Sequence, residues 1–271
     1  MRRMSGLVAL LVLSLVGCSD SNDPSSTGLS EAETSDVAEA VADEGDQSLD
    51  AVHLDRLGCA EVTDPEDSDG DGTPDAATFT FALPACSFTG FRGGTLEITG
   101  TIVVSDPTPL AADFNYQATL HDLTWRFTSP DQRRSYTAVR NGTRALSGNA
   151  GGFSLSNNIT VERTYPVRAP STVSHNLLLS FTPAAGESLV PGAPLPDGTF
   201  SRSGTFTWSR NGRSRTFVVT TVVPLEWDAS CSTDRKIVAG EIRATLGDGS
   251  YISTVWTGCG EEPTRTFVPV S

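Results

Sequence analysis

Apolar and polar residues alternate along the chain from residue 78 onward, and a period of two is typical of half-buried β-strands. In GTLEITGTIVV, residues 94–104, the residues Leu96, Ile98, Ile102 and Val104 fall on one face, and threonines dominate the other. Similar runs occupy residues 113–128, 133–147, 153–165, 173–182, 235–246 and 250–257. No long helical period follows residue 50. We therefore predict an all-β antiparallel meander that forms either a sandwich or a half-barrel.

The clearest hairpin lies in FSRSGTFTWSRNGRSRTFVVTTVV, residues 200–223, because Asn211-Gly212 is the pair that a two-residue type I′ turn prefers. This turn places Phe206 opposite Phe217 on one face, with Trp208 opposite Arg215 beside them. Hydroxyl residues occupy the other face, so the pattern predicts one packed face and one solvated face. Further turns are predicted at Asn141-Gly142 and Asp248-Gly249.

A bulge is predicted near His121-Asp122. In DFNYQATLHDLTWRF, residues 113–127, the apolar positions change at that point from even numbers to odd numbers. An extra residue in one strand of an antiparallel pair produces such a shift.

Two segments of the chain echo each other. GTLEITGTI at residue 94 and GTFSRSGTF at residue 198 share the pattern G-T-x-x-x-x-G-T, and each is followed about thirty residues later by Leu-x-Trp. Two related half-sheets, joined by the Pro- and Gly-rich residues 182–198, would explain the echo. Two unrelated strands that independently contain the same residues would explain the echo equally well, since Gly and Thr are common in such sheets.

The N-terminal segment has the features of an export signal. MRRMSGLVALLVLSLVGCSD contains two arginines and then an apolar run from Leu7 to Val16, which is too short to span a bilayer as a helix. Its Leu-Val-Gly-Cys end resembles the lipobox of bacterial lipoproteins. The resemblance implies that residues 1–17 are removed and that Cys18 carries acyl chains such as palmitate, which hold the protein at a lipid bilayer. The alternative is an ordinary signal peptide that ends near a cysteine.

Charge is distributed unevenly along the chain, whose formal net charge is −14. Residues 19–50 contain ten acids and no base, and few apolar residues, so we predict that residues 18–50 are a lipidated, disordered acidic tether. Residues 64–75 contain six acids and no base. The rest of the predicted domain, residues 51–271, holds seventeen acids and seventeen bases. A neutral domain argues against nucleic acid as a partner.

Cysteine arithmetic supports an exported protein. Acylation of Cys18 leaves Cys59, Cys86, Cys231 and Cys259, and an even remainder in an exported chain suggests two disulfides. Of the three connectivities we favour Cys59–Cys86 and Cys231–Cys259, because each pair is close in sequence. Metal ligation is the weaker alternative, since none of these cysteines has C-x-x-C spacing.

An acidic loop, PEDSDGDGTPD, has the spacing of a calcium site. Asp67, Asp69, Asp71 and Asp75 place hard oxygen ligands at alternate positions around Gly72, which suits calcium. The spacing matches the first nine positions of an EF-hand-type loop, and it resembles the loops of thrombospondin type 3 repeats. The resemblance implies that the four aspartates are side-chain ligands and that Thr73 offers its backbone carbonyl.

That resemblance is incomplete, because Thr78 stands where an EF-hand has its bidentate glutamate. Asp64, Glu66 or water would have to complete the coordination shell of the calcium ion. If Cys59–Cys86 forms, it encloses the predicted loop at 64–78. Calcium would then be a structural cofactor that stiffens the entry to the domain.

Catalytic constellations are hard to find in the sequence. His53, His121 and His175 are scattered, and no nucleophile elbow or phosphate-binding loop is present. We interpret His175, which shares a strand face with apolar residues, as a hydrogen-bonded core histidine. An arginine run flanks the predicted turns and is interpreted as solvated, with an anion-binding rim as the alternative: Arg133, Arg134, Arg140, Arg144, Arg210, Arg213 and Arg215.

These features together predict an exported lipoprotein, anchored through Cys18 to a membrane of the bacterial cell envelope. We expect no enzymatic activity, and a role as a binding or structural module for an envelope ligand or protein that the sequence does not name. One alternative is a carrier of lipid or small ligands, in which the curved sheet forms a half-barrel like that of lipoprotein-transfer factors of the outer membrane. A second alternative is a hydrolase of envelope polymers.

Overall fold

The computed structural model describes residues 58–89, 94–111, 113–132, 135–191, 193–233 and 236–270. These residues form thirteen strands: β1 (Glu61–Glu66), β2 (Ala76–Phe81), β3 (Ser87–Thr89), β4 (Thr95–Ser105), β5 (Tyr116–Thr128), β6 (Ser135–Asn149), β7 (Gly152–Thr164), β8 (Ser171–Pro183), β9 (Gly198–Arg210), β10 (Arg213–Trp227), β11 (Ile237–Leu246), β12 (Tyr251–Trp256) and β13 (Thr264–Val268). Within the described residues there is no helix that could cross a membrane. The all-β prediction is confirmed.

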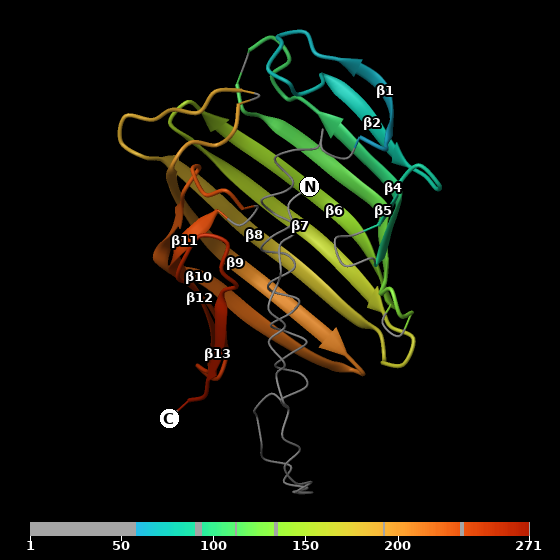
Figure 1. The fold of residues 1–271 in the computed structure, drawn as a ribbon, viewed down its shortest axis with the longest axis vertical. Helices are drawn as coiled ribbons and strands as arrows, with labels where there is room; N and C mark the ends of the chain where they lie inside the picture. The colour runs from blue at the N-terminus through green and yellow to red at the C-terminus, as the bar shows by residue number, and fades with distance from the viewer. Residues whose placement is uncertain are drawn as a thin grey trace, which may run out of the picture.

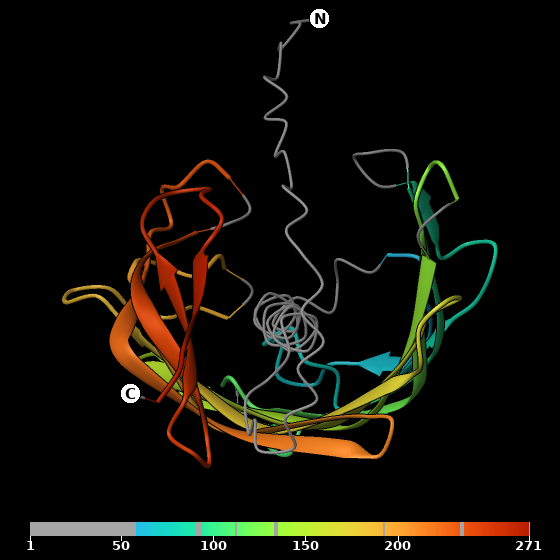
Figure 2. The same ribbon diagram turned by 90° about the horizontal axis from the view of Figure 1, so that it is seen from below.

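All thirteen strands belong to one antiparallel sheet, shown in Figure 1. Strands follow one another in chain order from β1 to β13, except that β3 pairs with β4 beside the β2–β4 pairing. Every pair of strands in extensive contact is a hydrogen-bonded neighbour, so among the described residues no second sheet packs on the first. Figure 2 shows the described strands as one curved layer that stays open on one side. Of the two predicted architectures, the half-barrel is the one observed.

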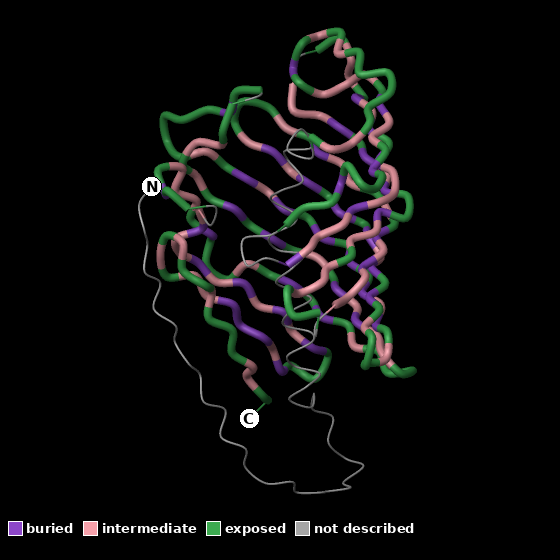
Figure 3. Tube along the Cα trace, turned by 45° about the vertical axis from the view of Figure 1, so that its right-hand side comes forward, coloured by how far each residue is buried: buried purple, intermediate pink, exposed green. Residues whose placement is uncertain are grey.

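One face of this sheet is apolar and buried, and the other is rich in hydroxyls. On β8, the odd-numbered residues from Val173 to Phe181 are buried and the even-numbered residues between them are more exposed, and β7 and β9 alternate in the same way (Figure 3). Figure 2 shows no described strand over the convex side, so the exposed face is the convex one. The buried apolar residues therefore lie on the concave face.

The β9–β10 hairpin has the predicted register. Phe206 pairs with Phe217 and Trp208 pairs with Arg215. Asn211 and Gly212 have φ angles of 52° and 74°, the positive values that a type I′ turn requires. The predicted turn at Asp248-Gly249 is also present, between β11 and β12.

The predicted bulge near His121-Asp122 is confirmed. Leu120 pairs with Gly142 and Leu123 with Arg140, so two residues of β5 lie opposite the single residue Asn141 of β6, which makes one extra residue in β5. Asp122 has a φ of 48°, and its backbone N–H donates to the side-chain oxygen of Asn141.

Long strands of the sheet bend where glycine lies inside them. Gly142 in β6 and Gly204 in β9 have φ angles of 142° and 135°. A Cβ on Gly142 would lie 2.1 Å from the carbonyl oxygen of Asn158, and one on Gly204 would lie 2.2 Å from that of Asn176. Only glycine permits so close an approach of the neighbouring backbone. The predicted turn at Asn141-Gly142 is therefore wrong, because β6 bends there and continues in the same direction.

No break in the sheet separates two halves. Residues 184–197 connect β8 to β9, and these two strands pair without a register shift from Ser171–Arg210 to Pro183–Gly198. Gly100 and Gly204, the second glycines of the repeated pattern, both adopt positive φ angles inside strands. The following tryptophans differ, since Trp125 pairs with Ile98 and Trp227 with Gly198. The sheet is thus continuous, and the echo marks similar bends within it.

Aromatic side chains close one end of the concave face. The rings of Phe153, Phe181, Phe200 and Trp227 contact one another with centroids 4.6–6.2 Å apart. Leu189, from the β8–β9 connection, is buried there and donates its backbone N–H to Ala150. The connection thus adds an apolar cap to this end of the sheet.

Candidate functional site

The acidic loop joins β1 to β2, and its own carboxylates shape it. Asp67 accepts hydrogen bonds from the backbone N–H groups of Gly70, at 2.8 Å, and Gly72, at 3.0 Å. Both glycines have positive φ angles, which lets the chain wrap around the Asp67 carboxylate. Asp71 accepts from the Thr73 N–H at 2.7 Å.

Three of the four predicted aspartate ligands converge. Asp67, Asp69 and Asp71 each offer a carboxylate oxygen within 4.8 Å of the others, and Asp71 is only 6% exposed. The Asp69 Oδ2 atom is buried and has no hydrogen-bond partner within the described part of the chain. Burial raises the pKa of Asp69, and the neighbouring charges of Asp71 and Asp67 raise it further. A hard cation with oxygen ligands would offset this repulsion, so the residues fit calcium.

Asp75 is engaged differently from the other three predicted aspartate ligands. The Asp75 carboxylate accepts hydrogen bonds from the Ser68 N–H, at 3.0 Å, and from the Ser68 hydroxyl, at 2.5 Å. These bonds lower the pKa of Asp75. Asp75 is not one of the three clustered aspartates, so in this geometry it closes the loop.

The segment between β4 and β5 supports the acidic loop, which the sequence analysis did not predict. The Asp113 N–H donates to Asp71 Oδ2 at 3.3 Å, and the Asp106 N–H donates to the Asp75 carbonyl at 3.1 Å. Asp106 is itself buried, and its Oδ2 has no hydrogen-bond partner among the described residues. Asp113 and Asp71 are separated by 42 residues, so no local spacing rule could have connected them.

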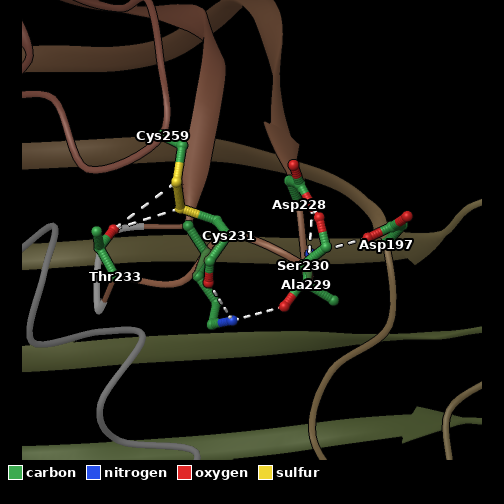
Figure 4. Close-up of a disulfide and its surroundings, with 8 residues drawn as sticks. Asp197, Asp228, Ala229, Ser230, Cys231, Thr233 and Cys259 are labelled. Atoms are coloured by element: carbon green, nitrogen blue, oxygen red, sulfur yellow. Dashed lines mark hydrogen bonds between the residues drawn. A yellow bond between two sulfur atoms is a disulfide. The ribbon is translucent and has the colours of Figure 1, made fainter.

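Both predicted cysteine pairs lie at disulfide distance, with sulfur separations of 2.07 Å for Cys59–Cys86 and 1.92 Å for Cys231–Cys259. The first pair encloses the acidic loop. Figure 4 shows the second pair beside Thr233. Nearby, Lys236 donates to the carbonyl oxygens of Ala229 and Cys231.

Arginines lie on the concave face, where the sequence analysis placed only Arg215, opposite Trp208. Arg140, Arg163 and Arg202 are all buried, at 3–6% exposure. The prediction that the arginine run is solvated is wrong for Arg140, whose guanidinium lies 4.3 Å from the ring centroid of Trp125. Arg213 is exposed as predicted, and Arg133 and Arg134 lie outside the described residues. The sequence does contain a signal for one buried arginine, because Arg202 lies in the same two-residue alternation as Phe200 and Phe206.

Arg144 and Asn157 form a polar pair in the middle of the concave face. They are cross-strand partners on β6 and β7. Asn157 is 4% exposed, and neither its Oδ1 nor its Nδ2 has a hydrogen-bond partner among the described residues. Leaving such a group unpaired costs about 1–3 kcal/mol. Arg144 is half-buried, and its Nε also has no partner in the described part of the chain.

Strands β5 to β10 place apolar side chains and no acidic side chain around this pair. The acids of strands β5 to β10 are Asp122, Glu162 and Glu226, and all three are exposed. Burial raises the pKa of Tyr116 to about 12, an effect that the charge of Arg144 partly offsets, so the phenol stays neutral at physiological pH. Strands β5 to β10 therefore bring arginines and no acidic side chain to the concave face.

The remaining predicted site residues are divided between described and undescribed parts of the chain. His175 is buried on the concave face, with its ring centroid 6.4 Å from that of Phe206, as expected for a core histidine. His121 is exposed. Cys18, His53 and the predicted tether lie outside the described residues. Comparisons of this chain with protein-family models, with curated proteins and with solved structures found no match.

Proposed function

We propose that this protein is a lipid-anchored, non-enzymatic binding module of the bacterial cell envelope that holds an apolar ligand on its concave face. One observation carries the proposal: a single curved sheet has one apolar face, and no described strand packs across it. An apolar sheet face needs a covering layer to stay out of water. A ligand on the concave face would supply that layer. This function unites the predicted binding module with the predicted carrier of lipid or small ligands.

Leu177 and Leu178 offer a matched test of apolar binding, because they are neighbours on β8 that face opposite ways. Leu177 is buried on the concave face, whereas Leu178 is 43% exposed. We expect the chain to bind the neutral fluorophore N-phenyl-1-naphthylamine saturably. Leu177→Gln should weaken this binding about tenfold or more, since it places an amide on the apolar face. Leu178→Gln should leave the affinity unchanged.

Fluorescence titration measures both affinities, and circular dichroism checks that each variant is folded. If the wild-type chain shows no saturable fluorescence, or if the two folded variants bind equally, the concave face is not a ligand site.

The anchor is the second part of the proposal and rests on the lipobox resemblance at Cys18. The predicted tether, residues 19–50, would connect the acylated cysteine to the sheet. We expect the mature N-terminus to be Cys18, carrying a thioether-linked diacylglycerol. Mass spectrometry of the N-terminal peptide tests this expectation, and an unmodified N-terminus at another residue would rule out the lipoprotein anchor.

Calcium is proposed as a structural cofactor of the acidic loop. Asp67, Asp69 and Asp71 would bind the ion through side-chain oxygens, and its charge would remove the repulsion between them. The loop connects β1 to β2 at the start of the sheet and contacts the β4–β5 segment through Asp113. Calcium would thus hold the first strands in place, without a role in ligand chemistry.

A further inference from the structure

We propose that the ligand of the concave face is an acyl phospholipid with an anionic headgroup, held by Arg144 and Asn157. The inference rests on the proposed apolar-ligand function and adds the chemistry of the headgroup. The acyl chain would lie along the apolar strand faces. The phosphate would lie in the middle of the sheet, where these two side chains meet.

Charge is the first argument for an anionic headgroup. Arg140 and Arg144 lie on β6 and Arg202 lies on β9, and all three alternate in phase with buried apolar residues. The acids of strands β5 to β10 are on exposed positions, so within these strands the concave face gains no negative charge. Arginine matches phosphate oxygens with paired N–H donors. A neutral lipid would offer no oxyanion to the Arg144 guanidinium, whose Nε has no hydrogen-bond partner among the described residues.

Asn157 is the second and independent argument. Its amide is buried beside Arg144, and both of its polar atoms lack hydrogen-bond partners among the described residues. A polar side chain so placed on an apolar face needs a partner from outside the strands. A phosphate oxygen would accept from Nδ2, and a glycerol hydroxyl of the headgroup would donate to Oδ1.

The apolar surroundings are the third argument, because they extend away from the polar pair along the strands. Leu155 and Leu179 form the next cross-strand pair on β7 and β8, and Phe153 and Phe181 follow at the aromatic end. These residues are buried. An acyl chain directed from Arg144 toward the Phe153 end would contact apolar side chains along its length.

The proposed anchor also favours phospholipid over a free fatty acid. A module held on a bilayer by Cys18 meets phospholipids at its own surface. Both ligands carry an oxyanion on an acyl chain, so the experiment includes each of them.

Displacement of N-phenyl-1-naphthylamine from the exported chain carrying Cys18→Ser tests the proposal. The competitors are palmitoyl lysophosphatidylglycerol, lysophosphatidylcholine, monopalmitoylglycerol and palmitate, each below its micelle concentration. We expect lysophosphatidylglycerol to compete at least about fivefold more tightly than the other three lipids. Arg144→Gln and Asn157→Leu should abolish this preference while the fluorophore still binds.

Arg126→Gln is the matched control, because Arg126 has a side chain that is 61% exposed and is not in phase with the buried residues of β5. It should keep the full preference. If all lipids compete equally, or if the preference survives both test variants, the headgroup assignment is wrong although apolar binding stands. If palmitate competes most tightly, the ligand is a fatty acid and the phospholipid assignment is wrong.

One further variant tests whether the acidic tether is the occupant instead of lipid. It replaces the ten acids of residues 19–50 by their amides. We expect the lysophosphatidylglycerol affinity to change less than about twofold. If only this variant binds lysophosphatidylglycerol, the chain's own tether occupies the arginines, and the proposal is overturned. Absence of fluorophore binding in every variant would instead contradict the proposed function itself.

Discussion

Gly142→Ala is expected to destabilise the protein by about 3–5 kcal/mol, because it combines backbone strain with a clash inside the sheet. Gly142 has a φ of 142°, a conformation that alanine avoids. Its new Cβ would lie 2.1 Å from the carbonyl oxygen of Asn158 and 2.8 Å from the Cα of Ile159. Strands β6 and β7 would have to separate at the bend. Calorimetry should show a melting temperature lower by about 10 °C or more.

Gly247→Ala is the control for this substitution. Gly247 lies in the β11–β12 turn, has no atom within 4 Å of an added Cβ, and does not have a positive φ. Its effect should stay within about 0.5 kcal/mol. If the two alanine variants melt at the same temperature, the bend of β6 does not depend on glycine.

Calcium is expected to raise the melting temperature of the wild-type chain by about 5–10 °C when its concentration is about one hundred times the dissociation constant. Asp69→Asn with Asp71→Asn should abolish this gain. In the absence of calcium Asp69→Asn alone should melt no lower than the wild type, since it removes repulsion between carboxylates and leaves both oxygens of Asp71 to accept from Thr73 and Asp113. Calorimetric titration and melting curves measure both effects, and Glu187→Gln, at an exposed position of the β8–β9 connection, is the control.

The pH dependence of calcium binding follows from Asp69. Its pKa is raised in the folded protein, so the folded state holds this proton more tightly than the unfolded chain does. The stability contributed by this group is present at low pH and is lost as the pH rises through the folded pKa. Calcium should therefore bind weakly in acid and stabilise most above that pKa. A calcium effect that is the same at pH 4 and pH 7 would contradict the site.

The two disulfides provide a second comparison for calcium. Cys59–Cys86 encloses the acidic loop with a sequence separation of 27, and Cys231–Cys259 has a separation of 28 but encloses no part of it. Loops of this length predict a similar loss of about 3–4 kcal/mol when either pair is replaced by alanine. Only replacement of Cys59 and Cys86 should also weaken calcium binding. Equal calcium affinity in the two variants would show that the enclosure does not organise the loop.

Much of the fold could be predicted because its signals are local. Alternation located β5 to β12 within a few residues, and Asn211-Gly212 determined the register of β9 with β10. Strand β1 was missed because its six residues, EVTDPE, are all exposed and do not alternate in polarity. The choice between sandwich and half-barrel was left open for a different reason. Both architectures bury alternate residues of each strand, so alternation does not distinguish them.

In the candidate sites too, the local features could be predicted and the long-range contacts could not. Asp67, Asp69 and Asp71 converge as predicted, because ligands at alternate positions of one loop come together locally. The support from Asp113 comes from a distant segment and carries no sequence signal. Arg144 was interpreted as solvated, with an anion-binding rim as the alternative, and Asn157 was not singled out, because a pattern of apolar and polar residues counts both as polar. Their pairing depends on the β6–β7 register, which the mistaken turn at Asn141-Gly142 concealed.

An open sheet has two edge strands, and each exposes unpaired backbone groups that another chain could pair with. Strand β1 forms one of these edges, and among its six exposed residues are Glu61, Asp64, Pro65 and Glu66. Proline removes a donor from that edge, and three carboxylates would face those of any second copy that approached it. If the proposed anchor at Cys18 concentrates molecules in two dimensions on a membrane, this edge would keep neighbouring copies from joining into a continuous sheet. Each copy would then remain a separate unit.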